Sequence, residues 1–189
     1  MRPTLLVLAL SALLTGCSGG QAPAAPQATA PVESDATADA AFAALSKEAL
    51  DTWMQLSPVS ATQIGDHRYD DQLDDLSAEG RQRRIDAGKA LLAKLEAIDA
   101  NRLSRANQVD AALLRNQLQA DLWTAEVLQD WAWDPQVYGG LAGSAIYGLM
   151  AREFAPLPDR IRAATARMEK LPTLFAQARA NLDPARVPR

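Results

Sequence analysis

A helical period of apolar residues runs through most of this chain and constrains its fold more than any other feature. In the first such segment five residues recur at spacings of three and four, namely Phe42, Leu45, Ala49, Trp53 and Leu56. This spacing places them on one face of a helix predicted over 39–56, with Asp35 or Asp39 as its cap. No segment alternates apolar and polar residues with a period of two, so the sequence predicts an all-α fold.

The same period predicts two further long helices. One begins at the candidate N-cap Ser77 and ends near Ile98, and its predicted buried face holds Ile85, Gly88, Leu91, Leu92, Leu95 and Ile98. The other begins at Ser104, ends near Gln129 and carries two apolar stripes, so we expect it to be buried on two sides. The first stripe holds Val109, Leu113, Asn116, Ala120, Trp123 and Val127, and the second holds Leu114, Leu118 and Leu122. Because the connection between these two helices is short, they should pack antiparallel.

A break separates the first long helix from the second. Ser57 as the N-cap, followed by Pro58 at the first helical position, predicts the start of a short helix over 58–64, which Gly65 ends in the left-handed conformation. Residues 66–75 show no period and contain many turn formers, so we expect an ordered loop there.

Proline and glycine also shape the last third of the chain. A helix predicted over 141–154 carries Gly143 and Gly148, which allow a neighbouring helix to approach closely. A last helix is predicted over 159–182, and Pro172 either kinks or divides it. The expected architecture is an antiparallel helical bundle.

The first residues have the pattern of a lipoprotein export signal. An apolar run of ten residues, Leu5–Leu14, follows Arg2 and is too short to span a membrane as a helix. It leads into Leu14-Thr15-Gly16-Cys17, which looks like a bacterial lipobox, in which the cysteine receives lipid and later acyl chains such as palmitate. We therefore predict a signal peptide over 1–16 and lipid attachment at Cys17. The alternative is a plain signal peptide in which this cysteine is incidental.

A linker follows the predicted anchor. Residues 17–38 are rich in Ala, Pro, Gly, Gln, Ser and Thr and are predicted to be disordered, whereas 39–189 form the helical part. Ser18 after Cys17 favours the outer membrane, so we expect the chain to be lipid-anchored there and to face the periplasm. The membrane is then its partner through the anchor.

The charge of the chain argues against nucleic acid as a partner. Its formal net charge is −4, and binding to phosphates requires a clustered basic face. The densest basic run is Arg81-Gln82-Arg83-Arg84, which we interpret as a solvated helix face.

The loop after the short helix holds the most chemistry. It contains His67, which is the single histidine, and five aspartates lie within ten residues, Asp66, Asp70, Asp71, Asp74 and Asp75. Three interpretations stay open: an ordered structural loop, the lining of a substrate cleft, and an independent cation site made of carboxylates and one imidazole.

Aromatic and basic residues elsewhere invite functional hypotheses that compete with simpler ones. Four tryptophans are interpreted as core and helix-packing residues rather than as a ligand platform, namely Trp53, Trp123, Trp131 and Trp133. The arginines of 152–153 and 160–162 could position an anionic substrate terminus, but a solvated helix face is the preferred interpretation.

Several motifs in order resemble the amino-terminal signature of the bacterial domain-of-unknown-function 885 family. The main one is Ser57-Pro58-x-x-Ala61-Thr62-x-x-Gly65-Asp66-His67-Arg68-Tyr69-Asp70-Asp71, followed by Leu76-Ser77. Further agreement comes from Trp131-x-Trp133-x-Pro135, from Arg167-x-x-x-Leu171-Pro172 and from Ala178-x-x-Asn181-Leu182.

This resemblance implies a helical, exported protein similar to gluzincin-type zinc metallopeptidases, with a peptide substrate and a zinc motif His-Glu-x-x-His on a later helix. The present chain has no such motif, and one histidine cannot supply the three protein ligands of a catalytic zinc. No catalytic or metal-binding residue is therefore assigned. We expect a non-catalytic amino-terminal portion of a longer protein, with His67, Arg68 and Asp70 as candidate cleft-lining residues. The alternative is a stand-alone helical envelope lipoprotein that acts as a binding or structural module.

Overall fold

The computed structural model describes residues 35–187, and within them every regular element is helical. The predicted signal peptide, Cys17 and nearly all of the predicted linker lie outside these residues. The helices are α1 (Ala36–Leu56), α2 (Pro58–Ile64), α3 (Ala78–Glu96), α4 (Arg105–Trp123), α5 (Gln136–Met150), α6 (Leu157–Met168) and α7 (Leu171–Asn181). The prediction of an all-α fold is confirmed. Across the part of the chain that is described, no helix is both long and apolar enough to cross a membrane.

Side-chain caps fix where the three long helices begin. The Asp35 carboxylate accepts a hydrogen bond from the Thr37 backbone amide at 2.8 Å, so α1 begins three residues before the predicted start. Ser77 caps α3 by accepting from the Gly80 amide at 3.0 Å, and Ser104 caps α4 in the same way. These caps satisfy amides that the first turn of a helix leaves without an intrahelical partner.

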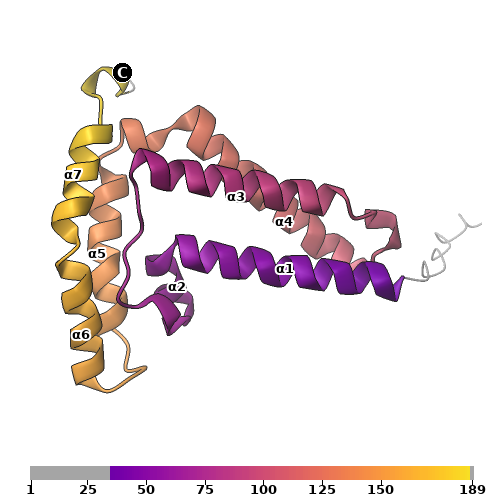
Figure 1. The fold of residues 1–189 in the computed structure, drawn as a ribbon, viewed down its shortest axis with the longest axis horizontal. Coiled ribbons are helices and arrows are strands. Elements are labelled where there is room, and N and C mark those ends of the chain that lie inside the picture. Colours follow the sequence, from indigo (N-terminus) through magenta and orange to yellow (C-terminus); the bar gives the residue numbers. More distant parts are fainter. Residues whose placement is uncertain (1–34, 188–189) are drawn as a thin grey trace, which may run out of the picture. The chain divides into compact units, whose positions relative to one another are not determined.

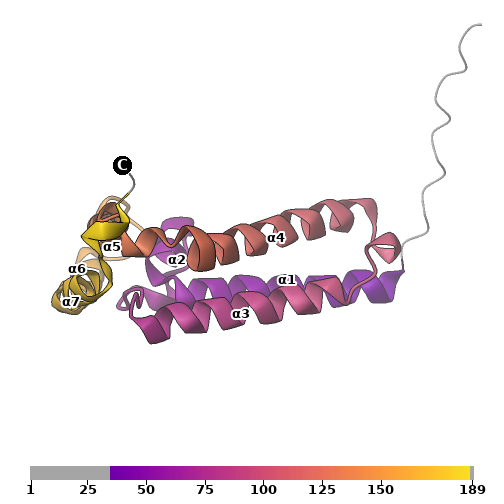
Figure 2. The same cartoon turned by 90° about the horizontal axis from the view of Figure 1, so that it is seen from above.

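Helices α1, α3 and α4 lie side by side, and α3 and α4 run antiparallel as predicted (Figures 1 and 2). Their shared core holds Phe42, Leu45, Ala49, Leu91, Leu95, Leu103, Ala111 and Leu118. A Cβ atom at Gly88 would lie 3.3 Å from a methyl group of Leu122, which shows how closely α3 and α4 approach.

Helix α5 lies beside α6 and α7 (Figure 1), and a second apolar cluster forms there around Tyr138, Leu174 and Ala178. Leu73 and Leu76, from the loop between α2 and α3, pack against this cluster. The loop is therefore held by the last helices of the chain as well as by the elements next to it in sequence.

Proline positions explain two differences from the predicted boundaries. Helix α5 begins at Gln136 rather than at residue 141, because Pro135 with its φ of −65° is already set for a helix start. Pro172 divides the last predicted helix rather than kinking it, since α6 ends at Met168 and Pro172 lies in the first turn of α7.

The prediction that the third long helix is buried on two sides is wrong for the described residues. Leu118 of the second stripe is only 8% exposed, but Leu113, Trp123 and Val127 of the first stripe are 63%, 54% and 64% exposed. The reason is that α1 and α3, the long helices that α4 contacts, both lie on its Leu118 side. Trp53 on α1 is 42% exposed, so Trp53 and Trp123 are not core residues as predicted, whereas Trp131 and Trp133 are half-buried.

Candidate functional site

A completely buried arginine organises the loop between α2 and α3. The guanidinium of Arg167, on α6, donates hydrogen bonds to five oxygens: Gln72 O at 2.8 Å, Ala145 O at 2.9 Å, Thr62 Oγ1 at 2.7 Å, Pro58 O at 3.1 Å and Tyr69 O at 3.3 Å. These acceptors belong to α2, α5 and the loop, so one side chain joins three separate parts of the chain to α6. Its side chain has no exposed surface.

The positive charge of Arg167 is partly offset by negatively charged aspartates of the loop. Burial lowers the pKa of Arg167, while the negative charges of Asp70, Asp74 and Asp71 act in the opposite direction. An arginine guanidinium ordinarily titrates so far above neutrality that it stays charged after such a shift. Three loop aspartates therefore offset the fixed positive charge of Arg167.

A chain of hydrogen bonds leads from Arg167 to the single histidine. Thr62 accepts from Arg167 and lies 2.6 Å from Asp70 Oδ1, and the other oxygen of Asp70 lies 2.9 Å from His67 Nδ1. A carboxylate only accepts, so Nδ1 of His67 is the nitrogen that donates. Nε2 has no hydrogen-bond partner among residues 35–187.

The histidine ring is also held by stacking. The rings of His67 and Phe154 are parallel within 9° and their centroids are 3.6 Å apart. The imidazole is thus fixed both in its plane by Asp70 and on its face by Phe154, and about a third of its side chain is exposed at 34%. Such an oriented imidazole can accept a hydrogen bond from a ligand at Nε2.

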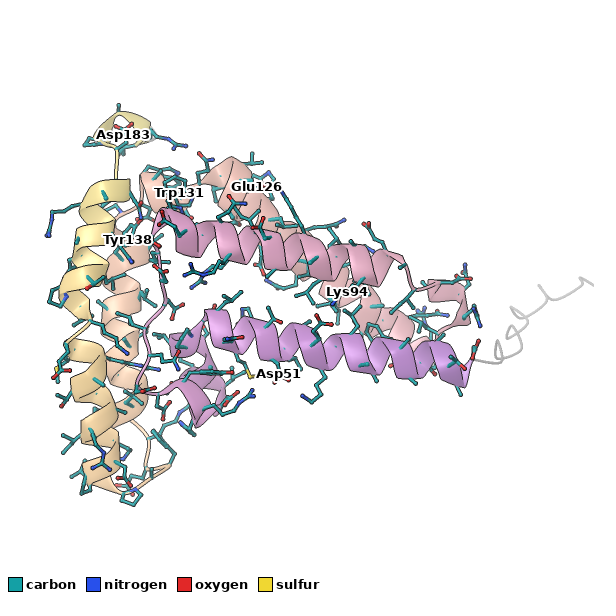
Figure 3. All side chains as sticks on the ribbon, in the orientation of Figure 1. Asp51, Lys94, Glu126, Trp131, Tyr138 and Asp183 are labelled. Carbon is teal, nitrogen blue, oxygen red and sulfur yellow. The ribbon has the colours of Figure 1, made fainter. Side chains whose placement is uncertain are left out.

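Arg68 does not join this group. Its guanidinium binds Asp66 at 2.6 Å and Asp51 of α1, which is labelled in Figure 3, at 3.0 Å. The hydrogen bonds from Arg68 lower the pKa of Asp66, and those from Lys47 and then Arg68 lower that of Asp51. Of the three candidate cleft-lining residues, the structure therefore brings His67 and Asp70 together and separates Arg68 from them.

The start of α2 is capped from the loop and not by Ser57 as predicted. Asp74 accepts a hydrogen bond from the Val59 amide at 3.1 Å, while Ser57 Oγ accepts from Arg84 of α3 at 3.1 Å. Arg84 also pairs with Asp74 at 3.2 Å. The side chain of Asp74, sixteen residues after Pro58, thus caps α2 in place of the side chain of Ser57.

The interpretation of 81–84 as a solvated helix face is wrong for two of its arginines. Arg84 is half-buried in the contacts just described. The guanidinium of Arg81 lies 3.7 Å from the centre of the Trp131 ring and donates to Leu76 O at 2.7 Å. Trp131 and Tyr138 lie near the amino end of α3 in Figure 3, and the Tyr138 hydroxyl donates to Trp131 O at 2.6 Å. Burial raises the pKa of Tyr138.

The arginines near the end of α5 are structural as well. Arg160 is buried and donates to the carbonyl oxygens of Ala155 and Met150 at 3.0 and 3.3 Å, which caps the carboxyl end of α5. Arg152 donates to Gln63 O at 2.8 Å, and Arg162 pairs with Asp159. Arg160 is therefore not part of a solvated helix face, and its guanidinium is not available to bind an anionic substrate terminus.

A cleft of about 570 Å³ lies between α1, the loop and α3. It is lined by Thr52, Gln55, Leu56, Pro58, Gln72, Leu73, Asp75, Gly80, Arg83, Arg84, Asp86 and Ala87. His67, Arg68 and Asp70 are not among these residues, so their role in lining a cleft of a longer polypeptide stays a prediction.

The described residues do not fit the catalytic zinc that the resemblance implies for longer relatives. Both carboxylate oxygens of Asp70 are engaged, by Thr62 and His67, and the chain offers one imidazole where a catalytic zinc needs three protein ligands.

Arg167 is the residue that sequence analysis missed as the centre of this region. One signal was available: Arg167 lies three residues after Ala164 and four before Leu171, and an arginine among apolar neighbours needs buried acceptors. The sequence gives no way to tell which acceptors those are, because four of the five lie about one hundred residues earlier in the chain.

Comparison with known proteins places this helical arrangement in a family. The sequence matches the family described as "Bacterial protein of unknown function (DUF885)" over residues 58–188. A solved structure described as "a putative lipoprotein of unknown function from Shewanella oneidensis" superimposes with a TM-score of 0.70 at 34% sequence identity. The match covers 75% of the present chain but 26% of that chain, so the present chain spans about a quarter of the length of its solved relative.

A comparison with curated proteins found no match. The family match covers the signature loop, Arg167 and every helix from α2 to α7. This chain therefore belongs to the DUF885 family of bacterial proteins of unknown function.

Proposed function

We propose that this chain is the non-catalytic, helical amino-terminal portion of an exported, lipid-anchored protein of the zinc metallopeptidase type. In this proposal it forms one wall of a peptide-binding cleft, and His67 and Asp70 face the cleft. The observation that carries the proposal is the family match over 58–188 together with a solved relative of which the chain spans about a quarter.

The geometry of the loop supports a binding role for His67 rather than a catalytic one. Asp70 and Phe154 hold the ring, and Nε2 is the atom left to contact a ligand. A peptide offers backbone amides as donors to such a nitrogen. Rigid support by Arg167 and Thr62 would lower the entropy lost when a peptide binds.

Anchoring is supported by the leader and by the relative. The sequence leading to Cys17 looks like a lipobox, and the solved relative is described as "a putative lipoprotein of unknown function". Several acyl chains at one cysteine give stable anchoring where a single chain is marginal. We propose that the chain is held at the outer membrane and faces the periplasm.

The proposal is tested on the polypeptide that the native gene encodes, purified from its own host. We expect a His-Glu-x-x-His motif after residue 189, one zinc per molecule, and peptide hydrolysis. A polypeptide without the motif, without zinc or without peptidase activity contradicts the proposal.

The role of His67 is tested in the same polypeptide by comparing His67→Ala with Lys94→Ala. Lys94 is an exposed residue of α3 that pairs with Glu48, and it is labelled in Figure 3. We expect His67→Ala to raise KM for a peptide several-fold and to leave the zinc content unchanged, while Lys94→Ala changes neither. Loss of zinc in His67→Ala would show that the histidine is a ligand and contradict the proposal.

The alternative function is a stand-alone helical envelope lipoprotein that acts as a binding module. The exposed first stripe of α4 is the observation that favours it, because a large exposed apolar face is typical of interaction surfaces. The native gene separates the two functions: a product that ends at residue 189, carries lipid at Cys17 and melts in one cooperative transition would favour the module.

A further inference from the structure

The outward stripe of α4 has the spacing of a helix-packing seam. It consists of Val109, Leu113, Asn116, Ala120, Trp123 and Val127, whose spacings are 4, 3, 4, 3 and 4. We call these six residues the α4 seam. Val109, Leu113, Trp123 and Val127 are the large apolar members and each is between 45% and 64% exposed.

The seam lies on the side of α4 that faces away from the bundle core. Ala111 and Leu118, which are buried in that core, lie about half a turn from the seam around the helix axis. The seam is therefore not the edge of the existing core but a second apolar surface. Its last member, Val127, lies in the π-helical turn Thr124–Leu128, which directly follows α4.

Alternating spacings of three and four are the pattern by which one helix packs against another along its length. A loop that covers a helix does not require this alternation. From Val109 to Val127 the seam extends about 27 Å, which matches a partner helix of roughly 18 residues. Ala120 beside Trp123 leaves a hole next to a large knob, and Asn116 at the middle can fix the register through a polar partner.

We propose that the α4 seam is covered by an α-helix from the part of a longer DUF885 polypeptide that follows residue 189. This inference rests on the proposed function, since it requires the chain to be a portion of a longer protein. The solved relative supports it, because the present chain matches only 26% of that polypeptide and the remainder is long enough to supply the helix.

A tethered helix fits the size of the seam better than a second copy does. Stable interfaces between separate molecules use roughly 20–30 residues on each side, and the seam offers six. A helix of the same polypeptide needs a smaller contact, because the tether provides a high effective concentration. In an antiparallel pair of two seams, Asn116 would also face Ala120 of the other copy and find no polar partner.

Photochemical crosslinking in the native host identifies the occupant. A benzophenone amino acid is incorporated in place of Val127 in the protein expressed from its own gene, and the control carries it in place of Gln119, an exposed position on another side of α4. After irradiation the product is analysed by gel mobility and by mass spectrometry of crosslinked peptides.

We expect the Val127 position to crosslink within one polypeptide, to a peptide that lies after residue 189, and the Gln119 position to give at least tenfold less of that product. A crosslink to a second copy, to another protein or to lipid overturns the inference, and so does the absence of a crosslink. If the inference about the seam fails in one of these ways but the gene encodes His-Glu-x-x-His after residue 189, the proposed function still stands. The two failures can therefore be told apart.

A pair of matched substitutions tests the inference without the large benzophenone side chain, which could itself disturb the packing. In the same polypeptide, Leu113→Glu should lower the melting temperature by several degrees, because it places a charge in the seam, while Gln119→Glu should leave it within about one degree. Equal melting temperatures for the two variants would show that the seam is open to water and contradict the inference.

Discussion

Arg167 uses its guanidinium to donate hydrogen bonds to five oxygens from three separate parts of the chain. Three of them are carbonyls of the segment 58–72, which has little regular structure after Gly65 and needs partners from outside. Buried polar groups without hydrogen bonds cost about 1–3 kcal/mol each. In this chain, part of the loop is therefore held in place by hydrogen bonds from one arginine.

Replacing Arg167 tests this explanation. Arg167→Met should lower the free energy of unfolding by about 3 kcal/mol or more, because it removes five hydrogen bonds that a buried charged group makes to three parts of the chain. Arg167→Lys keeps the charge but cannot reach all five oxygens, so we expect an intermediate loss. Urea denaturation measures both, with Arg179→Met on the exposed side of α7 as the control, expected within about 0.5 kcal/mol of the unmodified chain. Equal stability of all the proteins would contradict the role of Arg167.

Asp75 gives a prediction about pH. Burial raises its pKa, but hydrogen bonds from Ser77 and pairing with Arg83 outweigh burial, so the pKa in the folded chain is lower than the ordinary value. A group of this kind stabilises the fold above its unfolded pKa, and the effect is lost as pH falls through the folded pKa. Asp75→Asn should therefore be less stable than the unmodified chain at pH 7, and the difference should shrink towards pH 3.

Asp121 is the matched control because its pKa is shifted the other way. Burial raises the pKa of Asp121 above the ordinary value, so its ionisation opposes folding near neutral pH. Asp121→Asn should be at least as stable as the unmodified chain at pH 7, with no advantage at pH 3. Denaturation midpoints measured across this range check both variants, and the same sign for both would contradict the assignment.

At the scale of elements, the apolar period located the helices well, because caps and prolines agree with it. The helix predicted over 58–64 has those bounds in the structure, and Gly65 ends it at φ 95°. The period could not show which stripe of α4 faces the core. Both stripes are apolar, and burial depends on where α1 and α3 lie. The loop after Gly65 has no period at all, so its contacts with α6 were beyond sequence reasoning.

The two stripes of α4 predict opposite responses to truncation in this chain. Leu118→Ala removes buried methyl groups and should lower the free energy of unfolding by about 2–4 kcal/mol. Leu113→Ala removes the same atoms from an exposed position and should change it by less than about 0.5 kcal/mol. Chemical denaturation of the two variants is the measurement. A larger loss for Leu113→Ala would mean that the seam is buried even in the isolated chain.

At the scale of the whole molecule, the helical part carries two features that a self-contained domain does not need. One is an oriented histidine with an unused ring nitrogen, and the other is an apolar seam that faces away from the core. Both are accounted for if the chain is one portion of a longer, anchored polypeptide. The family and the all-α fold followed from the sequence, whereas the exposure of the seam depended on packing.

The intact mass of the mature protein, purified from the membranes of its own host, tests this account most directly. We predict an amino-terminal Cys17 that carries three acyl chains and a polypeptide mass well above that of residues 17–189. A protein without lipid, or a lipid-modified polypeptide that ends at Arg189, would contradict the account.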